Sequence, residues 1–173
     1  GFNVGKPEHP IVLIHGLNSS PNTWNPLVDQ FESLGWENGG TVNVYLDDRN
    51  IANLDSNDVE LVGNKGDFYT INFTKRDSNP LVEGNEEAVA RQGEGLSEAI
   101  REITAENDTS KVTLIGHSMG GLAAREYLQS PGFRNDVLSL ITIGTPHAGS
   151  DLADTATQYP AISNFVLGID PRS

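Results

Sequence analysis

The sequence predicts an α/β fold, with a mostly parallel central sheet and helices on both faces. Two observations lead to this prediction: apolar, β-branched runs alternate along the chain with amphipathic segments, and most of these runs lack the polar alternation of half-exposed strands. Such runs are typical of parallel strands buried on both faces, which need helical crossovers between them. With 173 residues and no internal repeat, the chain predicts a single domain over 1–173 that can bury a sizeable core.

The first predicted strand runs from Pro10 to Ile14, where apolar residues follow one another without a polar break. A helix is predicted next, and it stops near Gly35. Its apolar residues recur at the spacing of one helical face: Trp24, Leu27, Val28, Phe31 and Leu34.

The stretch from 36 to 67 has a weaker pattern. Thr41 to Leu46 alternates and predicts a short strand, whereas the Asp-, Asn- and Gly-rich residues 47–66 predict a surface excursion. The carboxylates of Asp55–Asp58 lack the ligand spacing and the bidentate glutamate of a known calcium loop, so we expect no metal there.

The second half alternates regularly between strands and helices. Strands are predicted over 68–74, 112–115 and 137–143, and helices over 86–105 and 122–129. The helix over 86–105 presents one apolar face, made of Val89, Leu96, Ile100 and Ile103. Gly93 and Gly95 weaken this helix, so we expect them to pack closely against the sheet.

Composition excludes several classes of function. The chain has 24 acidic and 11 basic residues, a net charge of −13, which argues against nucleic acid or an anionic membrane as an electrostatic partner. It has no cysteine, hence no disulfide framework and no thiol chemistry. No apolar run approaches the ~18 residues of a membrane-spanning helix, so no transmembrane segment is expected.

The most informative motif is Gly116-His117-Ser118-Met119-Gly120. An apolar run precedes it and small helix formers follow it, which predicts a strand, a sharp turn and a helix. The glycines give such a turn the room it needs, and the turn exposes the Ser118 hydroxyl at the carboxyl edge of the sheet. The first helical N–H groups point at the same place, where a developing oxyanion would need donors.

Three motifs together resemble the α/β-hydrolase superfamily, and within it the bacterial triacylglycerol lipase and esterase group. They are the turn at 15–17 after the first strand, the motif at 116–121, and the segment at 144–150. The resemblance covers residues 10–150 in the correct order, apart from the long insertion at 41–67. It implies that Ser118 is the nucleophile, that the backbone N–H groups of Leu17 and Met119 form the oxyanion hole, and that no cofactor is used.

Three histidines lie in these motifs: His15, His117 and His147. In the family, the corresponding histidines are structural or line the pocket. The resemblance places the general base later in the chain, after the acid. No histidine follows His147, so the acid and the histidine of the triad are expected outside this chain, and the domain is expected to lack its last strands.

The family's strand order places 137–143 at an edge of the sheet. A long apolar edge strand aggregates unless something pairs with it. We therefore expect a partner at Val137–Ile143: a C-terminal polypeptide fragment of the same protein, or a second copy of the chain.

The expected function is a serine carboxylic-ester hydrolase, a lipase or esterase acting on an acyl-ester or lipid substrate. Three alternatives remain open: an inactive or binding-only hydrolase fragment, an acyltransferase, or an amidase on the same fold. Residues 151–173 carry a weak helical pattern and are expected to form a lid or pocket wall, or else an ordinary core helix. The resemblance also implies a secreted or extracytoplasmic protein.

Overall fold

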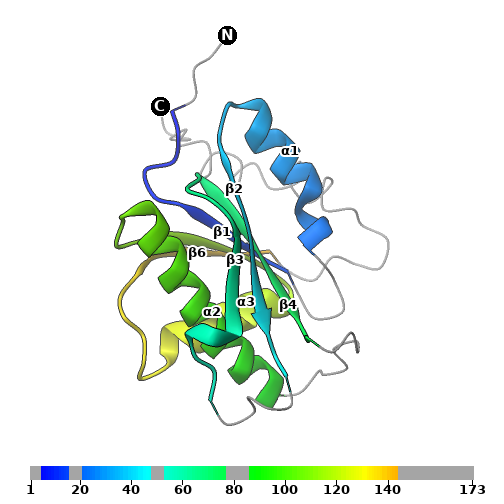
Figure 1. Cartoon of the computed structure of the whole chain (residues 1–173), viewed down its shortest axis with the longest axis vertical. Helices are drawn as coiled ribbons and strands as arrows, with labels where there is room; N and C mark the ends of the chain where they lie inside the picture. The colour runs from blue at the N-terminus through cyan, green and yellow to red at the C-terminus, as the bar shows by residue number, and fades with distance from the viewer. Residues whose placement is uncertain (1–4, 16–20, 48–52, 77–85, 144–173) are drawn as a thin grey trace.

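The computed structural model describes residues 5–15, 21–47, 53–76 and 86–143. The described residues form a six-stranded sheet, in the order β3-β2-β4-β1-β5-β6, with helices on both faces (Figure 1). The strands are β1 (Ile11–Ile14), β2 (Asn38–Tyr45), β3 (Val59–Gly63), β4 (Phe68–Thr74), β5 (Val112–His117) and β6 (Val137–Ile143). The helices are η1 (Pro21–Trp24), α1 (Asn25–Ser33), η3 (Ser56–Asp58), α2 (Glu86–Asn107) and α3 (Met119–Gln129).

The central strands confirm the predicted order. β4, β1, β5 and β6 lie side by side and run parallel, and β2 joins β4 in the same direction. In this register Ile14 of β1 is paired with Gly116 of β5 and with Ile71 of β4. The carboxyl ends of these strands therefore meet at one edge of the sheet, next to Ser118.

The predicted surface excursion over 47–66 is wrong in its second part. Residues Val59–Gly63 form β3, which pairs antiparallel with β2 and extends the sheet. The Asp- and Asn-rich residues before it form η3, where the side chains of Asp55 and Asp58 each accept a hydrogen bond from the other end of the turn. The polar residues thus form a capping box that starts a strand.

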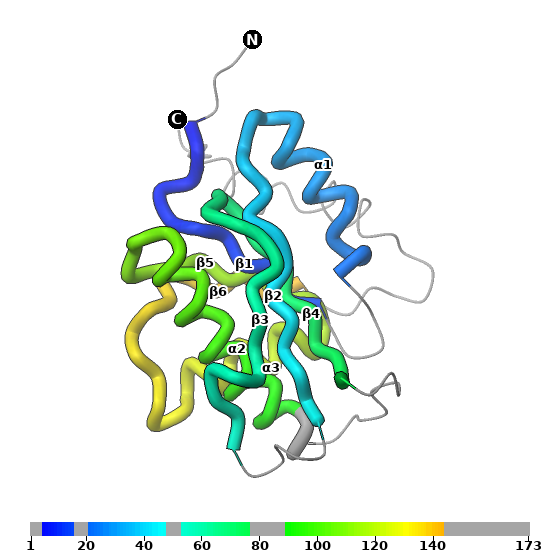
Figure 2. Tube along the Cα trace, in the orientation of Figure 1, coloured from blue at the N-terminus to red at the C-terminus, as the bar shows by residue number. Residues whose placement is uncertain are grey.

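Two apolar clusters cover the sheet, one on each face. The helices lie over the same faces, α1 on one and α2 with α3 on the other (Figure 2). On one face, α1 packs its buried Leu27 and Phe31, together with Trp24 of η1, against the sheet. On the other face lie α2 and α3. The buried α2 residues Leu96, Ile100 and Ile103 confirm the predicted face of this helix, while Val89 is only partly buried.

The two glycines of α2 pack differently from each other. A methyl group added at Gly95 would lie 2.3 Å from Cγ1 of Val44 in β2, so this glycine is pressed against the sheet as predicted. The prediction that Gly93 also packs against the sheet is wrong. A methyl group there would meet Cγ of Glu126 at 3.2 Å and the carbonyl oxygen of Ala123 at 3.3 Å, so Gly93 allows close packing of α2 against α3.

The predicted lid or pocket wall at 151–173 lies outside the described residues. Within the described ranges, no helix is both long enough and apolar enough to cross a membrane.

Candidate active site

Ser118 occupies the turn between β5 and α3. Its backbone has φ 55° and ψ −120°, a conformation that residues other than glycine rarely adopt. Two backbone hydrogen bonds hold the turn: the N–H of Ser118 donates to the carbonyl oxygen of Ile143 at 3.1 Å, and the N–H of Gly121 donates to the carbonyl oxygen of Ser118 at 3.0 Å. The strand, sharp turn and helix are those that the motif predicts.

The glycines around Ser118 leave no room for a side chain. A methyl group at Gly116 would lie 2.7 Å from Cα of Gly121, and one at Gly120 would lie 2.4 Å from the carbonyl oxygen of Ile14. Gly116 therefore lets α3 cross close to β5, and Gly120 lets α3 approach β1. Small residues at these positions set the angle at which the turn leaves the sheet.

The Ser118 side chain does not cap α3, although serine commonly does so at a helix start. Ser118 and Met119 are both partly exposed, whereas the flanking His117 and Gly120 are buried. Met119 is the first residue of α3, where backbone N–H groups lack helical acceptors and the helix dipole favours negative charge. This turn can therefore present a hydroxyl and a nearby N–H donor to an ester carbonyl.

The predicted second oxyanion donor, Leu17, lies outside the described residues. His15 is described and is 2% exposed, with its ring 5.8 Å from that of Phe73, centroid to centroid. β1 ends at Ile14, beside β5, so the chain enters residues 16–20 at the same sheet edge as Ser118.

His117 packs into the α1 layer. Its ring lies edge-on to Trp24, with centroids 6.3 Å apart, and the residue is 9% exposed. Within the described part of the chain, neither of its ring nitrogens has a hydrogen-bond partner. Burial lowers the pKa of His117, because the charged imidazolium loses its hydration. His147 and the later carboxylates Asp151, Asp154 and Asp170 lie outside the described residues.

Among the described residues, no group of three or more His, Cys, Asp or Glu side chains could hold a metal ion. The segment at 55–58, considered in the sequence as a calcium loop, uses its carboxylates in the capping box and in an ion pair with Arg76.

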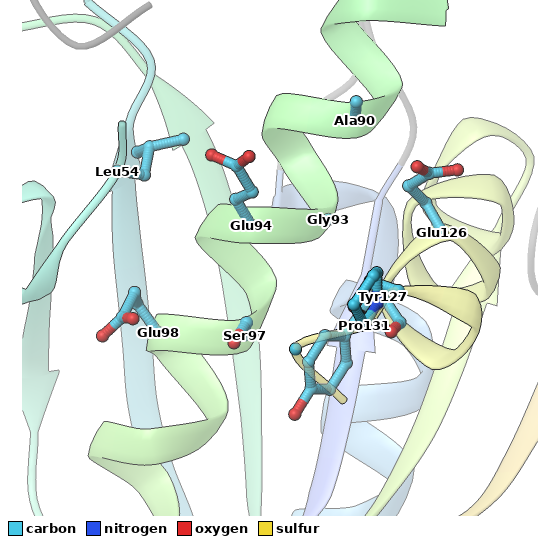
Figure 3. Close-up of a pocket in the computed structure, with 11 residues that line it drawn as sticks. Leu54, Ala90, Gly93, Glu94, Ser97, Glu98, Glu126, Tyr127 and Pro131 are labelled. Carbon is cyan, nitrogen blue, oxygen red and sulfur yellow. Dashed lines mark hydrogen bonds between the residues drawn. The ribbon is translucent and has the colours of Figure 1, made fainter. Parts of the chain in front are cut away.

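A cavity of about 400 Å³ lies between α2 and α3 (Figure 3), and Ser118 is not among the residues that line it. Three glutamates border it, together with apolar and small residues. The lining consists of Leu54, Ala90, Gly93, Glu94, Ser97, Glu98, Glu126, Tyr127, Ser130, Pro131 and Gly132. This cavity could not be predicted from the sequence, because its walls come from three separate segments.

A charged cluster that was not predicted from the sequence lies at the carboxyl edge of the sheet, and we call it the Arg76 cluster. It consists of Tyr45, Asp47, Asp58 and Arg76, and its two carboxylates are buried. A sequence signal existed, since Asp47 and Arg76 each follow closely on the end of a predicted strand.

Comparison with known proteins places the chain in a family. A family model described as a PGAP1-like alpha/beta domain matches residues 7–166. The chain belongs to this family. Solved structures agree with the PGAP1-like fold: a Listeria innocua protein aligns over 81% of this chain and 52% of its own, with a TM-score of 0.53 and 18% identity. A Lactobacillus plantarum protein described as a cell surface hydrolase aligns over 87% of this chain and 62% of its own, with a TM-score of 0.56 and 15% identity.

Several sequence relatives of this PGAP1-like domain are named as lipases or deacylases. It is 44% identical to a triacylglycerol lipase of Pseudarthrobacter phenanthrenivorans over 85% of this chain and 36% of that protein. It is equally identical to a triacylglycerol lipase of Burkholderia plantarii, over 85% of this chain and 32% of the relative. A GPI inositol-deacylase of Xenopus laevis is 33% identical over 62% of the chain. The chain thus spans about a third of the length of these two bacterial relatives.

Proposed function

We propose that this protein is a serine carboxylic-ester hydrolase, a lipase or esterase, in which Ser118 is the nucleophile. The observation that carries the proposal is the backbone of Ser118, which holds φ 55° between a buried strand and a helix N-terminus. A strained conformation of this kind persists only where the surrounding structure imposes it, and it occurs often at reactive side chains.

In the proposed reaction, the Ser118 Oγ attacks the acyl carbonyl carbon and the carbonyl oxygen becomes an oxyanion. The N–H of Met119 donates to that oxygen, and the N–H of Leu17 is proposed as the second donor. The alcohol leaves with a proton and the acyl group stays on Ser118, until water attacks the acyl-enzyme and releases the acid. We propose that the general base and its acid partner come from outside the described residues.

An acyl ester of a lipid is the proposed substrate class. Sequence relatives that are named triacylglycerol lipase or GPI inositol-deacylase support this substrate class. Among the described residues, β6 is an unpaired edge whose Leu138 is 58% exposed. We therefore also propose that a further segment of the same polypeptide pairs with β6 and supplies the missing triad members.

The test is hydrolysis of a series of nitrophenyl esters by the full polypeptide, with Ser118→Ala beside it. We expect Ser118→Ala to lower kcat by a factor on the order of 10⁴–10⁶, because a serine hydrolase keeps only its oxyanion and binding contributions without the nucleophile. Ser33→Ala is the matched control, since that hydroxyl only donates to the backbone oxygen of Gln30 on α1.

A fluorophosphonate probe provides a second readout, because it bonds covalently to an activated serine hydroxyl. Labelling of the wild type at Ser118 supports the proposal. A wild type that is neither labelled nor active contradicts it and favours a binding-only domain. If Ser118 is labelled but the acyl group goes to an added alcohol in preference to water, the protein is an acyltransferase. If anilides are cleaved in preference to esters, it is an amidase.

A further inference from the structure

The Arg76 cluster joins chain segments that are far apart in the sequence. The guanidinium group of Arg76 pairs with the carboxylate of Asp47, which follows β2. Its Nη1 lies 3.4 Å from Oδ1 of Asp58, and its Nη2 donates to the carbonyl oxygen of Asn57 at 2.6 Å. The guanidinium carbon also lies 4.5 Å from the ring centroid of Tyr45. One side chain therefore holds the end of β2 and the η3 turn to the end of β4.

The backbone strengthens this connection. The N–H of Arg76 donates to Oδ1 of Asp47 at 2.8 Å, so Asp47 fixes both the main chain and the side chain of Arg76. The carbonyl oxygen of Asp47 in turn accepts a hydrogen bond from Nη2 of Arg91 at 2.7 Å, which connects α2 to the same place. A buried carboxylate that binds a guanidinium group by several contacts has little freedom to move.

The Arg76 cluster lies on the substrate side of the sheet. Ligands of open α/β sheets bind outside the carboxyl ends of the strands. β2, β4 and β5 are parallel within the sheet, so the cluster and Ser118 are at the same edge. β4 is two strands from β5, a lateral separation of about 10 Å at the usual strand spacing.

The charges of the cluster favour a fixed geometry. Burial disfavours the charged form of Arg76, but the hydrogen bond and charge of Asp47 and those of Asp58 outweigh this effect and raise the pKa of Arg76. The arginine therefore stays charged, and its guanidinium is used within the protein. Arg76 offsets part of the negative charge of the two buried carboxylates, Asp47 after β2 and Asp58 in η3.

We propose that Arg76 is a positioning residue, which fixes the ends of β2, β4 and the η3 turn beside the Ser118 site and so determines the length of acyl chain that the site accepts. This inference rests on the proposed ester hydrolysis at Ser118. The cluster sets the positions of Asp47 after β2 and of Arg76 after β4. Arg76 touches neither Ser118 nor the ester carbonyl in this proposal, so it acts on substrate fit.

A second arginine provides a matched control, because it has similar partners at the opposite edge of the sheet. Nη2 of Arg134 lies 3.1 Å from Oδ2 of Asp136, and its guanidinium carbon lies 5.6 Å from the ring centroid of Tyr127. Asp136 is buried and its carbonyl oxygen accepts from the N–H of Val112, the first residue of β5. Arg134→Met therefore also removes an ion pair and a ring contact, but far from the substrate edge.

The experiment compares nitrophenyl butanoate with nitrophenyl laurate in the full polypeptide, for the wild type, Arg76→Met, Arg76→Lys and Arg134→Met. In Arg76→Met we expect kcat/KM for laurate relative to butanoate to change by about tenfold, mainly through KM, since small displacements of a binding surface change rates strongly. Arg76→Lys restores part of the ratio, because it keeps the charge. Arg134→Met leaves the ratio within about twofold of the wild type, whatever its effect on stability.

The outcomes separate the two proposals. Absence of Ser118-dependent hydrolysis in the wild type overturns the proposed function. Wild-type activity with the same chain-length ratio in Arg76→Met as in Arg134→Met overturns the inference alone. If Arg76→Met does not fold, Asp58→Asn decides, because it keeps the Asp47 pair and removes one charge. It should shift the ratio in the same direction by a smaller factor, and an unchanged ratio contradicts the positioning role.

Discussion

The Ser118 turn shows how single residues fix a reactive geometry. Ser118 adopts positive φ, and the absence of side chains at Gly116 and Gly120 brings α3 close to β5 and β1. The turn itself was predictable, because two glycines flank a serine between an apolar run and a helix former. The nucleophilic role of Ser118 and the oxyanion roles of Leu17 and Met119 stay predictions. The Arg76 cluster was missed, although Asp47 and Arg76 each follow the end of a predicted strand. The pairing of β2 with β4, which brings them together, is not readable from those positions alone.

Gly120→Ala tests this geometry. The new methyl group would lie 2.4 Å from the carbonyl oxygen of Ile14, a backbone atom that has little room to move. We expect the free energy of unfolding to fall by about 1–3 kcal/mol or more, together with loss of esterase activity. Gly132→Ala is the control, since its methyl group would have only Oγ of Ser130 near it, at 4.0 Å. Equal stability of the two variants in urea titrations would show that α3 is not locked to β1.

Because His117 is buried, we expect the free energy of unfolding to fall at acidic pH. Burial lowers its folded-state pKa below the ordinary value of 6.5, so the unfolded chain binds a proton at higher pH than the folded chain. The stability that neutral His117 contributes is present above about pH 6.5 and is lost as pH falls toward its folded-state pKa. We expect His117→Gln to lose less stability than the wild type between about pH 7.5 and about pH 5, as measured by urea unfolding at each pH. Parallel losses in both proteins would contradict a buried neutral imidazole.

At the scale of elements, the apolar pattern predicted the helices and central strands and their order, because parallel strands and amphipathic helices have clear periodicities. β3 was missed because it has only five residues and follows an Asp-rich turn, a composition typical of loops. The predicted packing partner of Gly93 was also wrong, since this residue packs against α3 and not against the sheet. A helix pattern shows which positions are close-packed, but does not distinguish the sheet from a neighbouring helix.

The contact between Gly95 and Val44 predicts a coupled pair of substitutions. Alanine favours a helix over glycine by about 1 kcal/mol, but a methyl group at Gly95 would lie 2.3 Å from Cγ1 of the fully buried Val44. We expect Gly95→Ala to destabilise the protein by about 1–3 kcal/mol through overpacking. In Gly95→Ala/Val44→Ala the lost methyl groups make room, so the double variant should be more stable than the sum of the single effects by about 1 kcal/mol. Additive effects in a thermal or urea double-mutant cycle would contradict close packing of α2 on β2.

At the scale of the whole molecule, β6 makes the described sheet asymmetric. One edge is the short strand β3, which ends at Gly63, where the backbones of β3 and β2 approach closely. The other edge is the seven-residue apolar strand β6. An exposed edge of this length pairs with whatever strand is available. The sequence predicted this edge through its resemblance to a family, and the strand order of the described residues confirms it. What covers β6 stays a proposal.

Hydrogen exchange on the full polypeptide tests the cover of β6. If a further segment pairs with it, the β6 backbone N–H groups should exchange about as slowly as those of β5, and the protein should remain monomeric over about a hundredfold range of concentration. Slow exchange together with a dimer would favour pairing of two copies. Fast exchange of the outward-facing N–H groups of β6 in a monomer would contradict both forms of pairing.

The hydrogen bond from the N–H of Ser118 to the carbonyl oxygen of Ile143 has a consequence for biosynthesis. Ser118 leaves the ribosome well before Ile143, so for part of translation the serine exists without the acceptor that helps hold its turn. The carbonyl oxygen of Ile143 thus makes the backbone at Ser118 depend on the strand after it, because the turn gains this hydrogen bond only when β6 has paired with β5.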